Sequence, residues 1–241
     1  MRKVISAVSV LALVAALLAA AFPTAVAAAA TCTATGFYRD SIDLTAAVIG
    51  NGTTVTGSVD ATGCNIGVYF DSSHTGSVSR ADIYGANYFG VVVNGGSVDV
   101  TDSSIHDIGE VPFNGEQHGV AVYYAYGSTS TGTVAGNDIW NYQKGGIVAN
   151  GIGASVTITG NTVTGLGLFP LNAQNGIQVG WGAAATITGN TVTGNIYTQG
   201  AATGYVASGI LLYQASLTTN VGAIASSNHS YGNQANILYV K

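Results

Sequence analysis

The nine residues TITGNTVTG occupy positions 157–165 and return unchanged at positions 186–194. Self-similarity at a fixed spacing is the signature of a protein built from stacked structural units. Weaker copies extend this element in both directions, each ending in a branched apolar residue after a turn of small or Asn residues. The copies end at Ile83, Ile105, Ile139, Val163 and Val192, with Ser230 as a sixth position.

A second element, a glycine followed by an apolar, a variable and another apolar residue, recurs in step with the first. Its copies are GVYF at 67, GVVV at 90, GVAV at 119, GIVA at 146, GIQV at 176 and GILL at 209. The alternation of apolar residues with Thr, Ser or Gly predicts short strands, and helical periodicity is absent after the first thirty residues. Such a unit cannot bury a face alone, so we expect the units to stack.

Together the two registers resemble right-handed parallel β-helices of the pectate-lyase-like kind, with PbH1-type repeats, over about residues 54–240. The resemblance implies an all-β, single-stranded solenoid of roughly seven to nine coils, with three sheets per coil and stacked aliphatic side chains inside. It also implies an asparagine ladder at the tight second turn, where Asn tolerates a left-handed backbone and can bond the next amide ~4.8 Å away. The predicted ladder is Asn137, Asn161, Asn190 and Asn228, with Ser103 and Ala81 in earlier coils.

The first thirty residues differ from the rest. Arg2 and Lys3 precede an apolar run over 4–22 and small residues near Ala27, which predicts a secretory signal peptide at 1–27 that is cleaved near Ala27 or Ala30. We therefore expect a secreted, extracellular protein with an N-terminal cap region at 28–53 and the β-helix at 54–241. The segment before Thr54 and the final ILYV are expected to cover the two ends of the stack.

Charge limits the partners. Only 7% of the residues are charged, and removal of the signal peptide leaves four basic residues against eleven acidic ones. Because such a surface is not cationic, nucleic acid and membrane are excluded as expected partners. Cys32 and Cys64 are the only cysteines, and in an oxidising compartment they are expected to form a disulfide. The alternative, a metal pair, lacks a nearby His and the four ligands of zinc, so no metal or cofactor is expected.

Comparison of the two registers places the variable length at one edge of the stack. The connections over 106–118, 164–175 and 193–208 are long, and Pro112 and Pro170 lie within them. Long loops on one edge of a solenoid commonly carry its function. In the resembled family a groove is formed by this turn and the outer face of the following strand. The outward positions there are Tyr69, Val92, Ala121, Val148, Gln178 and Leu211, with Tyr123 and Tyr213 two residues further on.

The loop HDIGEVPFNGEQH at 106–118 concentrates ionisable residues in a chain that has few. In one hypothesis, His118 is a general base, Lys144 of the next coil pairs with a sugar carboxylate, and Tyr123 or Tyr126 donates a proton, which is metal-independent uronate β-elimination. In another, Glu110 and Glu116 are the acid/base pair of a glycoside hydrolase. The third interpretation is a solvated loop without catalysis. The candidate catalytic residues are His118, Lys144, Glu116, Glu110, His106 and Tyr123.

Aromatic rings favour sugar binding, because a flat apolar face fits the C–H face of a pyranose. The candidate substrate-binding residues are Trp140, Tyr142, Tyr124, Tyr126, Gln178 and Tyr213. Alternatively, some of these rings cap coil ends or pack under loops. The expected partner is a polysaccharide that the protein binds or cleaves. The competing hypothesis is a noncatalytic surface or assembly protein, motivated by apolar outward residues, and it leaves open whether the chain is a monomer or self-associates.

Overall fold

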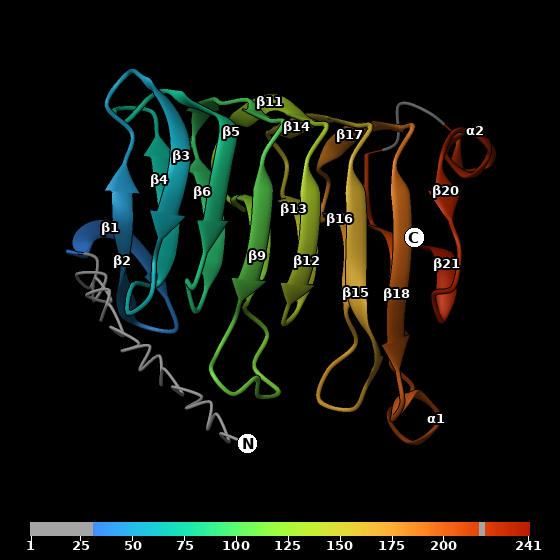
Figure 1. The fold of residues 1–241 in the computed structure, drawn as a ribbon. Coiled ribbons are helices and arrows are strands. Elements are labelled where there is room, and N and C mark those ends of the chain that lie inside the picture. The colour runs from blue at the N-terminus through green and yellow to red at the C-terminus, as the bar shows by residue number, and fades with distance from the viewer. Residues whose placement is uncertain (1–30, 217–219) are drawn as a thin grey trace, which may run out of the picture.

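A computed structural model describes residues 31–216 and 220–241 of the 241-residue chain (Figure 1). The predicted signal peptide lies outside the described residues. No helix within the described ranges has the length and apolar character needed to cross a membrane. The chain winds into an elongated stack, with its early strands at one end and its last strands at the other (Figure 1).

One face of the stack is a nine-stranded sheet, here called sheet A. Apart from the first pair, in which β1 is antiparallel to β2, its neighbouring strands are parallel. In spatial order it contains β1 (Thr33–Arg39), β2 (Ile42–Ile49), β4 (Ile66–Asp71), β6 (Phe89–Asn94), β10 (Val120–Tyr124), β13 (Gly145–Asn150), β16 (Asn175–Gly180), β19 (Ser208–Tyr213) and β21 (Ala235–Val240).

The other strands form a twelve-stranded sheet, here called sheet B, which makes two faces. The first half of β5 pairs with β8 on one face and its second half pairs with β9 on the other, so β5 joins the faces at their shared corner. Its strands are β3 (Thr54–Asp60), β5 (Ser77–Tyr84), β7 (Gly96–Ser97), β8 (Val100–Thr101), β9 (Ser104–Ile108), β11 (Ser130–Ala135), β12 (Asp138–Tyr142), β14 (Ala154–Thr159), β15 (Thr162–Phe169), β17 (Ala184–Thr188), β18 (Thr191–Tyr197) and β20 (His229–Ser230).

The predicted stacking of branched residues is confirmed. Consecutive partners in the parallel register of sheet B are Ile83, Ile105, Ile139, Val163, Val192 and Ser230. The five aliphatic residues are fully buried, and each contributes roughly 1.5–3 kcal/mol by burial. The interior is therefore a column of aliphatic side chains that continues from coil to coil.

The predicted asparagine ladder is also confirmed. The side-chain oxygen of Asn161 accepts the backbone N–H and the side-chain amide of Asn137, at 3.0 and 2.9 Å, and Asn190 serves Asn161 in the same way. Asn228 continues the ladder at one end and Ser103 at the other. The left-handed backbone, however, is not at the asparagines. It falls on Gly136, Gly160 and Gly189, the residues directly before Asn137, Asn161 and Asn190.

The predicted register of the glycine element is wrong in one coil. Gly67, Gly90, Gly146, Gly176 and Gly209 form a row in which a Cβ would meet the backbone of the next coil. In the remaining coil Ala121, not Gly119, occupies that row, since Val122 pairs with Val91 and Ile147. Ala121 is therefore buried in the core, and Tyr123 is the outward residue of β10.

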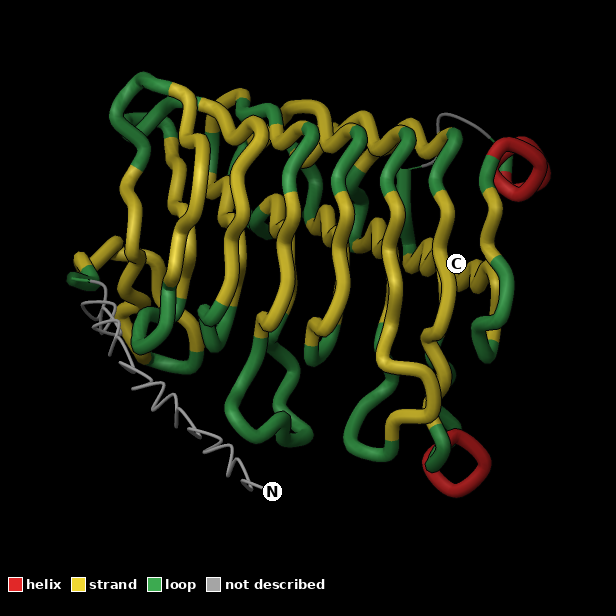
Figure 2. The backbone as a smooth tube through the Cα atoms, in the orientation of Figure 1, coloured by secondary structure: helices red, strands yellow, loops and turns green. Residues whose placement is uncertain are grey.

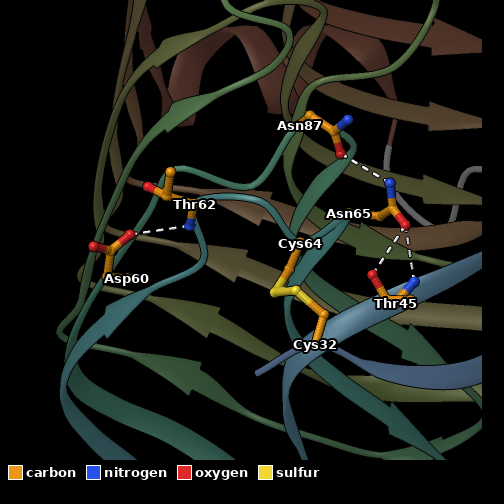
Figure 3. The surroundings of a disulfide bond; sticks show 7 residues. All are labelled: Cys32, Thr45, Asp60, Thr62, Cys64, Asn65 and Asn87. Atoms are coloured by element: carbon orange, nitrogen blue, oxygen red, sulfur yellow. Dashed lines mark hydrogen bonds between the residues drawn. A yellow bond between two sulfur atoms is a disulfide. The ribbon is translucent and has the colours of Figure 1, made fainter. Parts of the chain in front are cut away.

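The two ends of the stack are closed differently from each other. At the early end, Cys32 and Cys64 form the predicted disulfide, which ties β1 to the turn before β4, beside the hydrogen-bonded pair Asn65 and Asn87 (Figure 3). At the late end, helix α2 (Val221–Ser227) buries Ile224 against the core. The final ILYV is not a separate cover, because it belongs to β21 and pairs with β19. No helix was predicted at α2, which is less than two turns long and is stabilised by its contact with the core. Its one sequence signal is the N-cap Asn220, whose side-chain oxygen accepts the N–H of Ala223 at 2.8 Å.

The three long connections lie on one edge of the stack, as predicted. However, β15 and β18 extend to Phe169 and Tyr197, so the first parts of the loops predicted over 164–175 and 193–208 are strand. Figure 2 shows the connections after β9, β15 and β18 projecting from the same edge, with the short helix α1 (Gly200–Thr203) in the last of them. Each of these loops leads into a strand of sheet A. The loops therefore flank the outer surface of sheet A.

Candidate functional site

A groove of about 350 Å³ lies on the outer surface of sheet A, beside the long loops. Its floor consists of outward side chains from four consecutive strands, which are partners in the parallel register. These are Tyr123 of β10, Val148 of β13, Gln178 of β16 and Leu211 of β19. One side of the groove is formed by the long-loop edge and the other by the turns that follow β16 and β19.

Aromatic and amide groups are combined on this floor. The rings of Tyr123 and Phe89 are stacked, with their centroids 5.0 Å apart. Gln178 accepts a hydrogen bond from Asn175 at 3.0 Å and donates one to Asn150 at 3.2 Å, which holds the three amides in place. A largely apolar surface with a few convergent polar groups is typical of ligand sites.

The loop side of the groove is anchored by one glutamine per long loop. In each case the side-chain oxygen accepts backbone N–H groups of the loop or of the strand that leads into it. Gln143 accepts those of Glu110 and Asn114, Gln174 that of Leu166 in β15, and Gln234 those of Tyr197, the last residue of β18, and Ala207. Gln143 and Gln174 are buried. The loops are therefore bonded to the coils rather than only tethered at their ends.

Trp181 stands on the opposite side of the groove. Its ring lies 5.3 Å from that of Tyr213 and is 45% exposed. Its φ is 50°, whereas the equivalent residue of the previous coil is Gly151. A large side chain at positive φ costs on the order of 1–3 kcal/mol and is most often found at functional sites. Beyond Trp181 a second hollow of about 340 Å³ is lined by Tyr126 and Asn150.

The charges at the groove are positive. Of the four Lys and Arg among the described residues, Arg39 and Lys144 line the groove, whereas none of the carboxylates does. Lys144 Nζ donates to the backbone oxygen of Ala173 at 2.5 Å, and burial lowers the pKa of Lys144 to about 8. Arg39 donates to the backbone oxygen of Gln117 at 3.2 Å. A half-buried cation without a carboxylate partner favours an anionic ligand.

His118, the predicted general base, is not among the residues that line the groove. It is buried, its Nε2 is 3.0 Å from Glu110 Oε1, and its ring stacks on Tyr88 with centroids 3.8 Å apart. Burial, then the charge of Glu110, raises the pKa of Tyr88. Glu116 is exposed, and no hydrogen bond joins its side chain to that of Glu110, the other member of the predicted acid/base pair. The loop thus brings His118 and Glu110 together but places neither in the groove.

His106 and Trp140 lie on a different surface. They are partners on the outer face of sheet B, where the ring of His106 is stacked between Tyr84 and Trp140, at 5.4 and 4.4 Å. His106 also contacts Asp82 and Asp107 at 3.0 and 2.6 Å. One flat face of the Trp140 ring is therefore covered by His106. Neither residue belongs to the groove.

Two of the predicted sugar contacts lie in the core. Tyr124 and Tyr142 are fully buried, and their hydroxyls donate to Val98 O at 2.6 Å and to Asn195 Oδ1 at 2.7 Å. Burial raises the pKa of both tyrosines. The prediction that they contact a ligand is wrong, because both side chains lie inside the coils. Alternation along β10 points Tyr124 inward, whereas Tyr142 turns inward because the left-handed residue Asn141, with a φ of 49°, interrupts the alternation after Ile139. Of the predicted substrate-binding residues, Gln178 and Tyr213 line the groove and Tyr126 lines the adjoining hollow.

Comparison with known proteins identifies the family. The model of the right-handed beta helix region matches residues 46–236, which is most of the chain. The chain belongs to the right-handed β-helix family. Neither curated proteins nor solved structures gave a match. The family match therefore establishes the fold, and any function has to be argued from the groove itself.

Apolar outward residues of this β-helix do not form the exposed stripe that motivated the assembly hypothesis. Val92 and Val148 are buried in a cluster on the outer side of sheet A, which also contains Tyr69 and Phe89. Ala121 is inside the coil, and of the four residues only Leu211 is partly exposed. The surface is covered instead by aromatic side chains.

Trp181 and Arg39 were missed by sequence reasoning. Trp181 directly follows the strand GIQVG, and its alignment with Gly151 of the preceding coil was an available signal. Arg39 precedes the repeats, so the repeat register assigns it no position. Within the described part of the chain no group of three or more His, Cys, Asp or Glu side chains is placed to hold a metal ion.

Proposed function

We propose that this protein binds an acidic polysaccharide, with a segment of uronate-containing chain lying in the groove on sheet A. The observation that carries the proposal is that Arg39 and Lys144 both line a groove whose lining contains no carboxylate, in a chain with eleven acidic residues. Aromatic rings of Tyr123, Trp181 and Tyr213 supply apolar surface for pyranose faces. The disulfide is typical of oxidising compartments and supports an extracellular site of action.

Binding is measured through tryptophan fluorescence, because the chain has only two tryptophans. In a Trp140→Phe variant the remaining Trp181 reports on the groove. Polygalacturonate and alginate are titrated as uronate polymers, and dextran as a neutral control. We expect a saturable change with a uronate polymer that weakens as salt rises, and none with dextran. No response to either uronate polymer, or an equal response to dextran, would refute the proposal.

The contribution of charge is tested at Lys144. Lys144→Met keeps most of the side-chain volume and removes the cation, so binding should weaken at least tenfold, about 1.4 kcal/mol. Arg80 is an exposed cation outside the groove, and Arg80→Gln is the matched control for the lost charge. Equal effects of the two substitutions would indicate that net charge alone, not the groove, attracts the polymer.

A second candidate function, uronate β-elimination, is favoured by the pKa of about 8 for Lys144. Neutral Lys144, in place of the predicted His118, would remove the proton on the carbon next to the carboxylate. The C–O bond at the β position then breaks, and Tyr123, whose hydroxyl accepts the N–H of Tyr126 at 3.2 Å, protonates the leaving oxygen. New absorbance of an unsaturated sugar on incubation with polygalacturonate or alginate is the expected result. Binding without any such absorbance would leave a binding protein.

A further inference from the structure

The hairpin of β1 and β2 bends over the early coils of sheet A. Its turn residues Asp40 and Ser41 have φ of 50° and 67°, the two positive values of a tight two-residue hairpin turn. Phe37 of β1 lies with its ring 6.2 Å from those of both Tyr69 and Phe89, which belong to the outer side of β4 and β6. The hairpin therefore packs on the surface that the groove occupies further along.

Exposure along the outward row of sheet A agrees with this cover. Tyr69 is 2% exposed and Val92 is fully buried, although both point away from the core of the coils. Further along the same row, Gln178, Leu211 and Leu238 are partly exposed. The outer surface of sheet A is thus covered at the early coils and accessible at the late ones.

Arg39 lies between the covered early coils and the accessible late coils of sheet A. Its guanidinium donates to the backbone oxygen of Gln117, in the long loop that leads into β10. β10 is three strands beyond β2 in the sheet, so the hairpin reaches across roughly 14 Å of sheet surface. Arg39 lines both the groove and the adjoining hollow, and its side chain is partly exposed there. Its Nε also lies 3.9 Å from Asp40 Oδ2 of the hairpin turn, a weak and exposed ion pair that an incoming carboxylate can replace.

We propose that the groove is closed at the β1 end and accepts the end of an acidic polysaccharide chain, with Arg39 binding the carboxylate of the terminal sugar. A polymer that lay along sheet A from the late end of the stack to the early end would collide with the packed hairpin at Phe37. This inference rests on the proposed function, because it specifies which part of the polymer occupies the same groove.

Stoichiometry separates end binding from internal binding. Calorimetric titration uses oligomers of two defined lengths, one twice the other, made from whichever of polygalacturonate or alginate binds. With protein in excess, end recognition gives one protein per chain at both lengths. A ratio that rises with chain length would overturn the closed-end inference while leaving polysaccharide binding intact. Absence of binding to both polymers would instead overturn the proposed function itself.

The role of Arg39 is tested with Arg39→Gln, which keeps a hydrogen-bond donor near Gln117 and removes the charge. We expect at least tenfold weaker binding of both oligomers, with Arg80→Gln unchanged from the native protein. Unfolding temperature is measured for both variants so that loss of structure is recognised. Native affinity in a folded Arg39→Gln variant would show that Arg39 does not bind the terminal carboxylate.

Discussion

Lys144 Nζ lies 2.5 Å from the backbone oxygen of Ala173. This hydrogen bond joins the residue directly before β13 to the loop that leads into β16, the next strand of sheet A. This neutral acceptor satisfies one of the three ammonium donors and supplies no compensating charge. Burial accordingly lowers the pKa of Lys144 to about 8. A charged group in this environment is costly for folding and is retained where it meets an anionic ligand.

Lys144→Met is therefore expected to stabilise the free protein at pH 7 by about 1 kcal/mol, or about 2–4 °C in Tm. The effect depends on pH. Below pH 8 the lysine is charged in both the folded and the unfolded chain. Between pH 8 and its ordinary pKa only the unfolded chain holds the proton, so the stability contributed by this site rises with pH. Thermal unfolding from pH 7 to 10 should show the advantage of the variant shrinking, and an advantage that grows with pH would contradict the assignment.

Gln143→Leu is expected to destabilise the protein by about 3 kcal/mol. Leucine has a similar volume, but it leaves the N–H groups of Glu110 and Asn114 without their acceptor. Urea unfolding measures the loss, and limited proteolysis should cut within the loop that precedes β10. Gln199→Leu, at an exposed glutamine, is the control. Similar losses in both variants would mean that the amide of Gln143 does not anchor the loop.

Asn161→Ala interrupts the ladder at its centre and is expected to cost about 2–4 kcal/mol. The backbone N–H of Asn137 and the carbonyl of Val134 both lose their side-chain partner in a buried setting. The adjacent Thr162 is exposed, so Thr162→Ala should change stability by less than about 0.5 kcal/mol. Chemical denaturation of the two variants gives the comparison. A loss below 1 kcal/mol for Asn161→Ala would show that water replaces the ladder bonds.

Trp181→Gly should separate stability from binding. Glycine adopts positive φ freely, as Gly151 does in the previous coil, so the substitution removes backbone strain. We expect Tm to change little, because relief of strain offsets the lost contact with Tyr213, while affinity for a uronate polymer falls at least tenfold. Trp140→Phe, at the tryptophan that lies outside the groove, is the control and should bind the polymer as the native protein does. Unchanged affinity in Trp181→Gly would remove the indole from the binding surface.

The predicted fold rests on residues that repeat. Ile83 to Val192 and the ladder from Asn137 to Asn228 were assigned correctly, because stacked parallel strands place equivalent side chains over one another. The glycine element was displaced in one coil, since the long loop before β10 hides where the strand begins. A shift of two residues kept Val122 inside but exchanged Ala121 with Tyr123 as the outward residue. Repetition therefore predicted the coils better than the loop junctions.

The sequence by itself determined a solenoid of parallel strands, its inner column, its ladder, its disulfide and the edge on which the long loops gather. These features follow from local pattern and from a repeat that acts between neighbouring coils. Only the tertiary structure decided that the β1 hairpin covers the early coils and that Arg39 reaches Gln117. It also decided that His118 is buried against Tyr88 and Glu110, outside the groove, while Lys144 lines it. Such contacts join segments outside the repeat, so packing and solvation of the complete chain determine them.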